Sequence, residues 1–504
     1  MKLALSSAVG LASGATLALT APPTNLHFAP FVGLAGLAWA LRETARGPGR
    51  AVARAALVGA AFGTGANLVA LRFVPEVIQR FTELGAGLSY LALALLAPAQ
   101  ALGWLLAGVL AAILQRRGGP PPLATATGVF AGTFFPALFP WTPAGGISPW
   151  PILLQLADVI GERGVTFLMA FACAGAVEAV MLRAAARTRG MAWLALTGLV
   201  GAAAVAYGAA RIDQIDRRRA AAPHLRIGLL QPGFEARQRW EPARAQPILD
   251  NLVRLTRFAE AKGAEIVIWP ESAYPYAISH AMRHDPVGEL AIRGEGVRGP
   301  VMTGIYMVAG HGSAFNSAAI AYPDGTLSEP YDKRHLLWFG ETVPLADELP
   351  FLRRWFSRGT GILPGTKHVL LSWGRMRAGV LNCYEDTIGL AGREAQEGAN
   401  LLVNVTNDAW FAGSAEGELH LYLSALRAIE TRKDLVRAVN LGPTSFVDAA
   451  GRVRARYAEP MPAPLIVDAA LLDGDPTFFA RAGDVPMVLL IVAGVLARRR
   501  RALA

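Results

Sequence analysis

The sequence has little charge and very little cysteine for its length. Charged residues make up 17% of its 504 residues, hydrophobic residues make up 53%, and the mean hydropathy is +0.35. In soluble domains about a quarter of all residues are charged, so a large part of this chain is expected to lie in lipid. Cys173 falls in an apolar run and Cys383 in a more polar region. The two are not expected to meet, which excludes a disulfide framework.

The sequence also lacks the patterns of a metal site or a phosphate-binding loop. Its eight histidines show no ligand spacing, and His335 and His420 are interpreted as hydrogen-bonded structural residues. No glycine-rich loop precedes a lysine of the P-loop type. We therefore expect no metal and no cofactor. The net charge of +10 comes largely from arginine clusters beside apolar runs, which is typical of membrane topology, so no nucleic-acid partner is expected.

Apolar runs long enough to suggest membrane helices recur along the chain. A helix of about 20 apolar residues crosses a bilayer, because its backbone amides stay paired. No small-residue cleavage site precedes a soluble domain, so the first run is interpreted as a membrane helix and not as a signal peptide. The second, fifth and last runs are short for a full crossing. About eight spans are predicted, at residues 3–20, 27–41, 51–71, 88–115, 123–138, 165–182, 191–209 and 485–497.

Basic residues between these runs predict the orientation of the chain. With a cytoplasmic N-terminus, every strongly basic short loop falls on the cytoplasmic side. The long segment from Arg211 to Asp484 then faces the opposite side, and the basic cluster 217–219 near its start counts little because long domains translocate largely regardless of charge. The cytoplasmic clusters are Arg42, Arg46 and Arg50; Arg116 and Arg117; Arg183, Arg187 and Arg189; and Arg498 to Arg501.

The long segment shows alternating strand and helix patterns, which predict an α/β domain. Helices are predicted at 242–262 and 418–433, and the sequence Pro-Asp-Gly at 323–325 predicts a hairpin turn. Strands are predicted at 225–231, 264–269, 301–309, 378–382, 401–405 and 435–440. The predicted organisation is a helical membrane part at 1–210 with about seven spans, a catalytic domain at 222–476, and a last span with a basic tail at 485–504.

Three short motifs in this segment hold residues able to do chemistry. Glu271 lies in WPES, Lys333 in YDKRH and Cys383 in LNCYE. Glu271 follows a predicted strand, where α/β folds usually place reactive groups, although an exposed turn glutamate would show the same pattern. Taken alone, Lys333 fits a solvated surface charge, and Cys383 fits a buried structural cysteine.

The ordered set of these residues is more specific than any one of them. Glu271, Lys333 and Cys383 follow one another at intervals of 62 and 50 residues. This set resembles the nitrilase superfamily, whose catalytic triad is glutamate, lysine and cysteine. The residue types suit that chemistry, because a thiol with an ordinary pKa of about 8.5 needs a base and a cation to attack near neutral pH.

Membrane helices on both sides of such a domain are similar to the apolipoprotein N-acyltransferase family, the membrane-embedded branch of that superfamily. The resemblance covers nearly the whole chain and implies an α-β-β-α sandwich for the α/β domain. Further motifs carry it: Phe139-Pro140-Trp141, Gln231-Pro232 with Trp240, Phe315-Asn316-Ser317, Phe339-Gly340-Glu341, Asn407-Asp408-Ala409-Trp410-Phe411, Arg437-Ala438-Val439-Asn440 with Gly442, and Arg481-Ala482-Gly483-Asp484.

The resemblance implies a two-step acyl transfer in the bacterial inner membrane, with the catalytic domain on the periplasmic side. Cys383 would take a fatty acyl chain from a phospholipid, phosphatidylethanolamine being the expected donor. The chain would then pass from this thioester to the α-amino group of a lipoprotein's S-diacylglyceryl cysteine. Glu271 would be the general base and Lys333 would stabilise the oxyanion. The enzyme is expected to act as a monomer.

Four further residues match positions that the family uses near the site. Glu341 and Glu385 are expected to orient Lys333 and the substrate amine, although a purely structural role fits as well. Trp240 and Tyr384 are expected near the substrate, and their aromatic bodies suit acyl chains at a membrane edge. Simple packing also fits both aromatic residues.

Two other functions are compatible with parts of the sequence. A membrane-anchored amidase or hydrolase would have the same triad, and a paralogue would have a different acyl acceptor. The family's tyrosine and glutamine after Phe-Pro-Trp are missing from residues 145–148, which bears on substrate contacts. A transporter would carry ionisable residues within its spans. The apolar runs contain few ionisable residues beyond Glu178, which disfavours a transporter.

The aromatic segment 345–364 is interpreted either as a mobile lid or as surface packing.

Overall fold

The computed structural model describes residues 2–45, 50–82, 84–182, 186–310, 312–338, 340–343, 348 and 361–503. The chain divides into two compact units. Unit 1 comprises Met1–Asp213, Ser414–Leu426 and Arg481–Ala504, and unit 2 comprises Gln214–Gly413 and Arg427–Ala480. The division predicted from the sequence, at 1–210, 222–476 and 485–504, stays a prediction, because compact packing does not mark where a membrane begins. Phe339 and most of the segment 345–364 lie outside the described residues.

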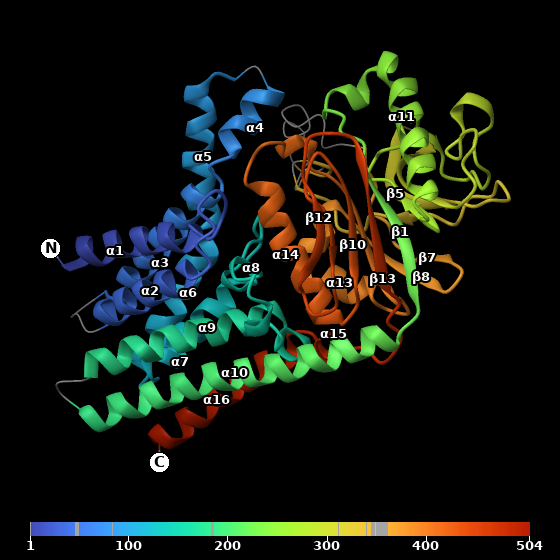
Figure 1. Cartoon of the computed structure of the whole chain (residues 1–504). Coiled ribbons are helices and arrows are strands. Elements are labelled where there is room, and N and C mark those ends of the chain that lie inside the picture. Colours follow the sequence, from blue (N-terminus) through green and yellow to red (C-terminus); the bar gives the residue numbers. More distant parts are fainter. Residues whose placement is uncertain are drawn as a thin grey trace. The chain divides into compact units, whose positions relative to one another are not determined.

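Unit 1 is helical (Figure 1). Each of the eight predicted spans overlaps at least one helix, although residues 133–138 of the fifth are not helical and the fourth covers two helices. Among the described residues, four helical segments are long and apolar enough to cross a membrane, at Ala51–Ala70, Ala86–Arg116, Ala157–Leu182 and Arg187–Ala221. The count of about eight spans therefore stays a prediction.

The helices of unit 1 are α1 (Lys2–Ala18), α2 (Ala29–Ala45), α3 (Ala51–Ala70), α4 (Val74–Phe81), α5 (Ala86–Gln100), α6 (Leu102–Arg116), α7 (Pro121–Gly132), α8 (Pro143–Gly146), η1 (Pro151–Leu153), α9 (Ala157–Leu182), and α16 (Val485–Leu503). Helix α10 (Arg187–Ala221) ends in unit 2.

Close helix packing in unit 1 depends on residues without side chains. A Cβ atom at Gly14 of α1 would lie 1.8 Å from the carbonyl oxygen of Phe62 in α3. A Cβ atom at Gly59 of α3 would lie 2.1 Å from the carbonyl oxygen of Trp104 in α6. Small residues let helix backbones approach in this way, and such contacts stabilise helix packing in membranes, where burial of apolar surface contributes little.

Helix α9 begins at Ala157, earlier than the apolar run at 165–182 predicts. Its backbone is kinked at Gly161, where φ is 68°. The added turns carry Asp158, whose carboxylate accepts a hydrogen bond from Arg211 Nη2 at 2.6 Å. Near the other end, Glu178 accepts a hydrogen bond from Arg42 Nη2 at 3.0 Å. Both carboxylates are paired within unit 1, so helix packing accounts for them and no ion pathway is needed.

Unit 2 is built on two β-sheets (Figure 1). In the described residues the first sheet has the order β13-β1-β2-β4-β5-β6, with β3 beside β4, and the second has the order β12-β11-β10-β9-β8-β7. The first sheet contains β1 (His224–Gln231), β2 (Ile266–Ile268), β3 (Ile278–Ser279), β4 (Val301–Gly310), β5 (Ser313–Ala321), β6 (Tyr331–Asp332) and β13 (Ala463–Ala470). The second contains β7 (Leu370–Trp373), β8 (Met376–Asn382), β9 (Leu401–Asn407), β10 (Leu435–Asn440), β11 (Thr444–Val447) and β12 (Val453–Tyr457).

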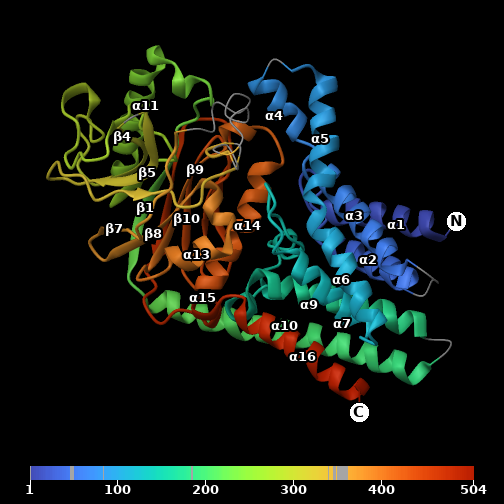
Figure 2. The same ribbon diagram turned by 180° about the vertical axis from the view of Figure 1, so that it is seen from behind.

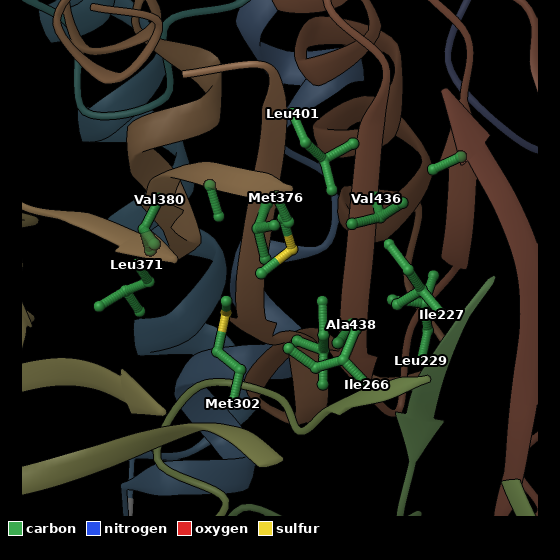
Figure 3. Close-up of a cluster of buried hydrophobic side chains, with 14 of the residues drawn as sticks. Ile227, Leu229, Ile266, Met302, Leu371, Met376, Val380, Leu401, Val436 and Ala438 are labelled. Atoms are coloured by element: carbon green, nitrogen blue, oxygen red, sulfur yellow. The ribbon is translucent and has the colours of Figure 1, made fainter. Parts of the chain in front are cut away.

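The two sheets pack face to face over a buried apolar core (Figure 3). Alternation along the strands supplies it, since every second side chain of a strand points to the same face. Ile227 and Leu229 of β1 enter this core, whereas Leu230 packs on the other face of the sheet, with α11 (Pro242–Ala261). The core between the sheets includes Ile266, Met302, Leu371, Met376, Val380, Leu401, Val436 and Ala438.

Helices cover the outer faces of the sheets, which confirms the predicted α/β sandwich. Helix α11 packs on the first sheet, and α13 (Gly389–Ala395) packs on β8 of the second (Figure 2). The approach of α13 is close, because a Cβ atom at Gly379 would lie 1.9 Å from the carbonyl oxygen of Ala395. Further helices are η2 (Gln238–Trp240), η3 (Gly288–Leu290), η5 (Cys383–Thr387), η6 (Asp408–Phe411), α14 (Glu416–Thr431) and α15 (Phe478–Ala482).

The predicted strands all occur, and no end is shifted by more than two residues. Strand β2 is shorter than predicted at both ends, since it covers only Ile266–Ile268 of the predicted 264–269. Both predicted helices correspond to α11 and α14. The predicted turn at 323–325 is present, with the Gly325 amide donating to the Tyr322 carbonyl oxygen at 3.0 Å. The sequence patterns therefore located the strands that precede Glu271 and Cys383, but not β5 and β6 beside Lys333.

Candidate active site

Cys383 lies where the buried strand β8 turns into η5. Its φ angle is 52°, a left-handed conformation that residues other than glycine seldom adopt. Such a sharp turn projects the side chain out of the sheet, and backbone strain of this kind is common at functional sites. Cys383 is partly exposed, unlike the buried Cys173. A reactive thiol needs that access, so the position fits a nucleophile better than a structural cysteine.

Glu271 lies on a second strained turn, directly after β2. Ser272, the next residue, has a φ angle of 52°. The turn presses against Gly304 of β4, where a Cβ atom would lie 2.5 Å from Glu271 Cα and from the Ser272 nitrogen. The backbones are also joined, because the Gly304 amide donates to the Pro270 carbonyl oxygen at 3.2 Å. Glu271 is buried with 7% of its surface exposed, which excludes the exposed turn glutamate.

Lys333 follows β6 and is almost fully buried, with 1% of its side chain exposed. Its amide donates to the carbonyl oxygen of Asn316 in β5 at 2.9 Å, and its carbonyl oxygen accepts from the Gly365 amide at 2.8 Å. Asp332, the preceding residue, accepts from Ser317 Oγ at 2.6 Å. These contacts fix the backbone on both sides of the lysine. The interpretation of Lys333 as a solvated surface charge is therefore wrong.

The three candidate catalytic side chains and Glu341 meet in one polar cluster. Lys333 Nζ lies 2.7 Å from Glu341 Oε2 and 3.5 Å from Glu271 Oε1. Beyond the effect of burial, the Glu271 charge raises the pKa of the Cys383 thiol and the Lys333 charge lowers it, so both groups act on the thiol. A base, a cation and a thiol are thus within reach of one another, which is the arrangement that thiol activation requires.

Hydrogen-bond donors around Glu271 favour its ionised form. Asn316 Nδ2 donates to Glu271 Oε1 at 2.7 Å and to Glu341 Oε1 at 2.7 Å. The Asn407 amide donates to Glu271 Oε2 at 3.1 Å. Burial and the nearby Glu341 carboxylate act the other way, and the pKa of Glu271 lies above its usual value. A carboxylate with a raised pKa is a stronger base, as removal of a thiol proton demands.

Cys383 is neutral at rest, whereas Lys333 is charged. Burial raises the pKa of the Cys383 thiol well above its usual value, with a further increase from Glu271, so the resting thiol is neutral. Burial alone would lower the pKa of Lys333, but Glu341 and Glu271 raise it well above its usual value. Lys333 is therefore a permanent cation beside a neutral thiol. It can stabilise negative charge when that charge appears on sulfur or oxygen.

Glu341 and Glu385 occupy different places around Lys333. Glu341 pairs with the lysine ammonium directly. Glu385 is fully buried and accepts hydrogen bonds from the amides of Arg334 and His335 at 2.8 Å and 2.9 Å, and from the Asn382 amide at 2.7 Å. Glu385 therefore joins the segment after Lys333 to the strand before Cys383. Both glutamates are expected to orient Lys333 and the substrate amine. Glu341 contacts the lysine ammonium, whereas Glu385 contacts the backbone amides of the two residues after Lys333.

The two predicted aromatic residues lie on different elements of unit 2. Trp240, in η2, is 57% exposed, and its ring stacks at a tilt on Tyr306 of β4 with 5.5 Å between centroids. Arg239 holds this segment against the Glu271 turn, since its Nη1 donates to the Pro275 carbonyl oxygen at 2.8 Å. Tyr384 follows Cys383 in η5. An exposed indole beside a buried polar cluster is available for contact with an apolar ligand.

Sequence reasoning missed a set of buried asparagines around the catalytic cluster. Asn316 links both glutamates, and its Oδ1 accepts from Asn382 Nδ2 at 3.1 Å. Asn407 holds Glu271, and Asn440 Nδ2 donates to Asn407 Oδ1 at 3.0 Å. Asn316, Asn407 and Asn440 belong to motifs that carried the family resemblance, which was the available signal. Their roles depend on neighbours across strands, which spacing along the chain does not reveal.

Replacing Gly304 by alanine should impair the site from its backbone side. The new Cβ atom would meet main-chain atoms of the Glu271 turn at 2.5 Å. Because backbone cannot yield as a side chain does, we expect the turn to shift, with a loss of about 1–3 kcal/mol in unfolding free energy and at least a tenfold loss of activity. Thermal unfolding and acyl-transfer assays measure both effects. Gly299→Ala is the matched control, because its nearest neighbour is the end of the Glu260 side chain at 3.2 Å; equal effects in both variants would contradict the prediction.

The pH dependence of activity should report the coupling between the two glutamates. As the candidate general base, Glu271 must be ionised, so activity should fall as pH drops through an apparent pKa above the ordinary value of 4.5. The Asn316 amide lowers the pKa of both Glu271 and Glu341. Asn316→Ala should therefore move the acidic limb of kcat/KM to higher pH. A limb that stays in place, with Asn400→Ala as the control, would contradict this.

Comparison with known proteins identifies the family. Residues 13–175 match the apolipoprotein N-acyltransferase N-terminal domain, and residues 226–462 match the carbon-nitrogen hydrolase family. An apolipoprotein N-acyltransferase of Bradyrhizobium diazoefficiens is 30% identical over 98% of this chain and 95% of its own length. One from Brucella melitensis is 30% identical over 96% of this chain and 93% of its own length.

A solved structure is also similar to part of the chain. A variant amidase of the nitrilase superfamily from Nesterenkonia covers 53% of this chain and 98% of its own, with 20% identity and a TM-score of 0.40. The near full-length relatives decide the assignment, because they include both the helical part and the α/β part of the chain. The chain therefore belongs to the apolipoprotein N-acyltransferase family.

Proposed function

We propose that this enzyme transfers a fatty acyl chain from a phospholipid to the α-amino group of the S-diacylglyceryl cysteine of a lipoprotein, through a thioester on Cys383. The observation that carries the proposal is a buried ion pair of Lys333 and Glu271, 3.5 Å apart, whose charges both act on the Cys383 thiol. The family supplies the substrates, and this cluster supplies the chemistry. Phosphatidylethanolamine is the proposed donor, with the sn-1 ester as the point of attack.

In the first step Cys383 attacks the ester carbonyl while its proton passes to Glu271. A carbon–sulfur bond forms, and negative charge develops on the carbonyl oxygen. Lys333 stabilises that charge, with the backbone amide of Tyr384 as a second donor. The carbon–oxygen bond to glycerol then breaks. The lysophospholipid leaves with the proton that Glu271 had taken, so the carboxylate is ready for the second step.

In the second step the acceptor amine attacks the thioester. Glu271 takes a proton from the amine, a carbon–nitrogen bond forms, and the carbon–sulfur bond breaks. The sulfur leaves as a thiolate beside the Lys333 ammonium and regains its proton from Glu271. Atoms and charges balance without a metal or an oxidant. One base therefore serves both half-reactions.

The remaining candidate residues support these steps. Glu341 holds the Lys333 ammonium at 2.7 Å and is available to the incoming amine. Glu385 fixes the backbone next to Lys333 and Cys383. Trp240 provides an exposed aromatic surface for an acyl chain or headgroup. Tyr384 contributes its amide to the oxyanion and its ring to the substrate contact.

The membrane setting is part of the proposal. We infer a multi-pass protein of the bacterial inner membrane, with about eight spans and with the α/β domain at 222–476 on the periplasmic side. The spans would bring two lipidated substrates to the site from the bilayer. Tethering an amidase to the membrane would need only one span. The enzyme would act as a monomer.

The test is N-acylation of a synthetic diacylated lipopeptide by the purified enzyme in phosphatidylethanolamine micelles. Mass spectrometry of the lipopeptide should show the mass of one added acyl chain on the amine, and Cys383→Ala should give none. If phospholipid were consumed but only free fatty acid appeared, the enzyme would be a hydrolase. If an amine other than this lipopeptide were acylated, it would be a paralogue with a different acceptor. Either result would overturn the proposed acceptor.

A further inference from the structure

A buried asparagine behind the nucleophile holds the carbonyl group of Cys383. Asn404 lies on β9 beside Leu381 of β8 and is fully buried. Its Nδ2 donates to the carbonyl oxygen of Leu381 at 3.0 Å and to that of Cys383 at 3.1 Å. No other side chain among the described residues donates to the Cys383 carbonyl. This contact reaches the reactive residue through its backbone.

A buried ion pair sets the orientation of that asparagine. Arg437 Nε donates to Asn404 Oδ1 at 3.3 Å and to Asp386 Oδ2 at 3.1 Å. The side chains of Arg437 and Asp386 are both fully buried. A guanidinium can only donate hydrogen bonds, so the amide oxygen of Asn404 must face Arg437. Its NH2 group is thereby left for the Cys383 carbonyl.

The geometry of the peptide bond carries this constraint to the next residue. In a trans peptide the C=O and N–H groups point in opposite directions. Because Asn404 holds the Cys383 carbonyl, the Tyr384 N–H points away from Asn404. In the described part of the chain this N–H has no acceptor among protein groups. The positive φ of Cys383 makes the constraint necessary, since a strained turn persists only where its surroundings hold it.

We propose that Asn404 is a positioning residue, which fixes the Cys383–Tyr384 peptide so that the Tyr384 N–H can donate to the substrate oxygen as negative charge develops. The Arg437–Asp386 pair keeps Asn404 in the required orientation. The proposal rests on the proposed role of Cys383 as the nucleophile. It explains why a fully buried arginine lies on β10, where it touches no candidate catalytic side chain among its recorded hydrogen bonds.

The test separates oxyanion stabilisation from thiol reactivity. Full-length enzyme in detergent is treated with p-nitrophenyl butyrate, which acylates Cys383 through an oxyanion, or with iodoacetamide, which alkylates the thiol without one. Asn404→Asp keeps the size but puts an oxygen where the NH2 group was. We expect acylation by the ester to fall about 10²-fold or more, whereas alkylation stays unchanged. Asn404→Ser, which is too short to reach the carbonyl, should show the same split if the aspartate variant does not fold.

A matched control comes from the same strand region. Asn400 is also buried, and its Nδ2 donates to a backbone carbonyl oxygen, that of Arg375, at 2.9 Å. Asn400→Asp should leave the ratio of acylation to alkylation unchanged. If the Asn404 variants lost both reactions in proportion, they would merely displace Cys383, and the proposal would be wrong. An unchanged ester rate would also overturn it.

The experiment distinguishes failure of the Asn404 positioning role from failure of the proposed function. If the unaltered enzyme acylates the lipopeptide but the Asn404 variants show no change with the ester, only the positioning role fails. If the unaltered enzyme reacts with the ester but not with phospholipid, the proposed donor fails, and the ratio still decides the role of Asn404. If Cys383 reacts with neither ester nor phospholipid, both proposals are wrong.

Discussion

Glu271→Gln should slow formation of the acyl-enzyme by about 10²–10⁴-fold, the usual contribution of a general base. Glutamine has nearly the same shape but cannot accept the thiol proton. Both oxygens of Glu271 accept hydrogen bonds, from Asn316 Nδ2 and from the Asn407 amide. A glutamine NH2 group would face one of these donors, so a loss of about 1–3 kcal/mol in unfolding free energy is expected as well.

The measurement is the rate at which the mass of one acyl chain appears on the intact enzyme. Glu265→Gln serves as the control, because Glu265 also accepts a backbone hydrogen bond, from the Arg226 amide at 3.1 Å, but lies exposed in the same unit. That variant should acylate at the unaltered rate. A Glu271→Gln enzyme that acylates as fast as its Glu265→Gln control would remove Glu271 from the role of base.

Lys333→Met should damage both stability and catalysis. The ammonium is 1% exposed and is the cation that neutralises Glu341 and Glu271. Its removal leaves two buried carboxylates without a counter-charge, which costs about 3–5 kcal/mol when a buried pair is broken. The oxyanion also loses a donor, so acylation should fall by a further factor of about 10²–10³. Thermal unfolding and acylation rates measure the two effects.

A double variant separates these two effects. Glu341→Gln in the Lys333→Met background removes the carboxylate left unpaired, so much of the lost stability should return. Acylation should stay as low as in Lys333→Met, because the oxyanion donor is still absent. Recovery of acylation together with stability would mean that Lys333 has only a structural role. A stability loss that is simply additive in the double variant would contradict the direct Lys333–Glu341 coupling.

The residues of the site that could be predicted are those that lie in short motifs recognisable along the chain. Glu271 and Cys383 each follow a strand that shows in the sequence as a β-branched or aliphatic run. The two-residue strand before Lys333 shows no such run. The order and neighbours of these three residues then indicated the superfamily. The three residues could therefore be named as candidates, although the sequence could not show that Lys333 is buried or that Glu341 lies 2.7 Å from it.

Strand β5 shows why other parts could not be predicted. Its sequence, Ser313–Ala321, consists mainly of alanine and serine and has a single β-branched residue, Ile320, so it shows little of the composition that marks strands. It forms a strand because β4 and β6 pair with it on either side. Asn316 lies on this strand, so its place between two glutamates was hidden with it. Cross-strand neighbours are determined by tertiary pairing, which overrides local propensity.

Helix α9 shows the same limit in unit 1. Hydropathy placed the span at 165–182, because Asp158, Glu162 and Arg163 interrupt the apolar run. The helix continues through them to Ala157. Arg163 pairs with Asp484 at 2.7 Å and Asp158 with Arg211 at 2.6 Å. Ion-pair partners from distant segments make these charges compatible with the helix. Such partners cannot be identified from a single stretch of sequence.

The most direct test of the account is to find where the acyl chain resides during the reaction. The enzyme is incubated with phosphatidylethanolamine carrying an isotope-labelled sn-1 chain, digested, and its peptides are analysed by mass spectrometry. The account predicts the label on the peptide that contains Cys383, its loss from that peptide when the diacylated lipopeptide is added, and no label in Cys383→Ala. Label on another residue, or lipopeptide acylation that persists in Cys383→Ala, would contradict it.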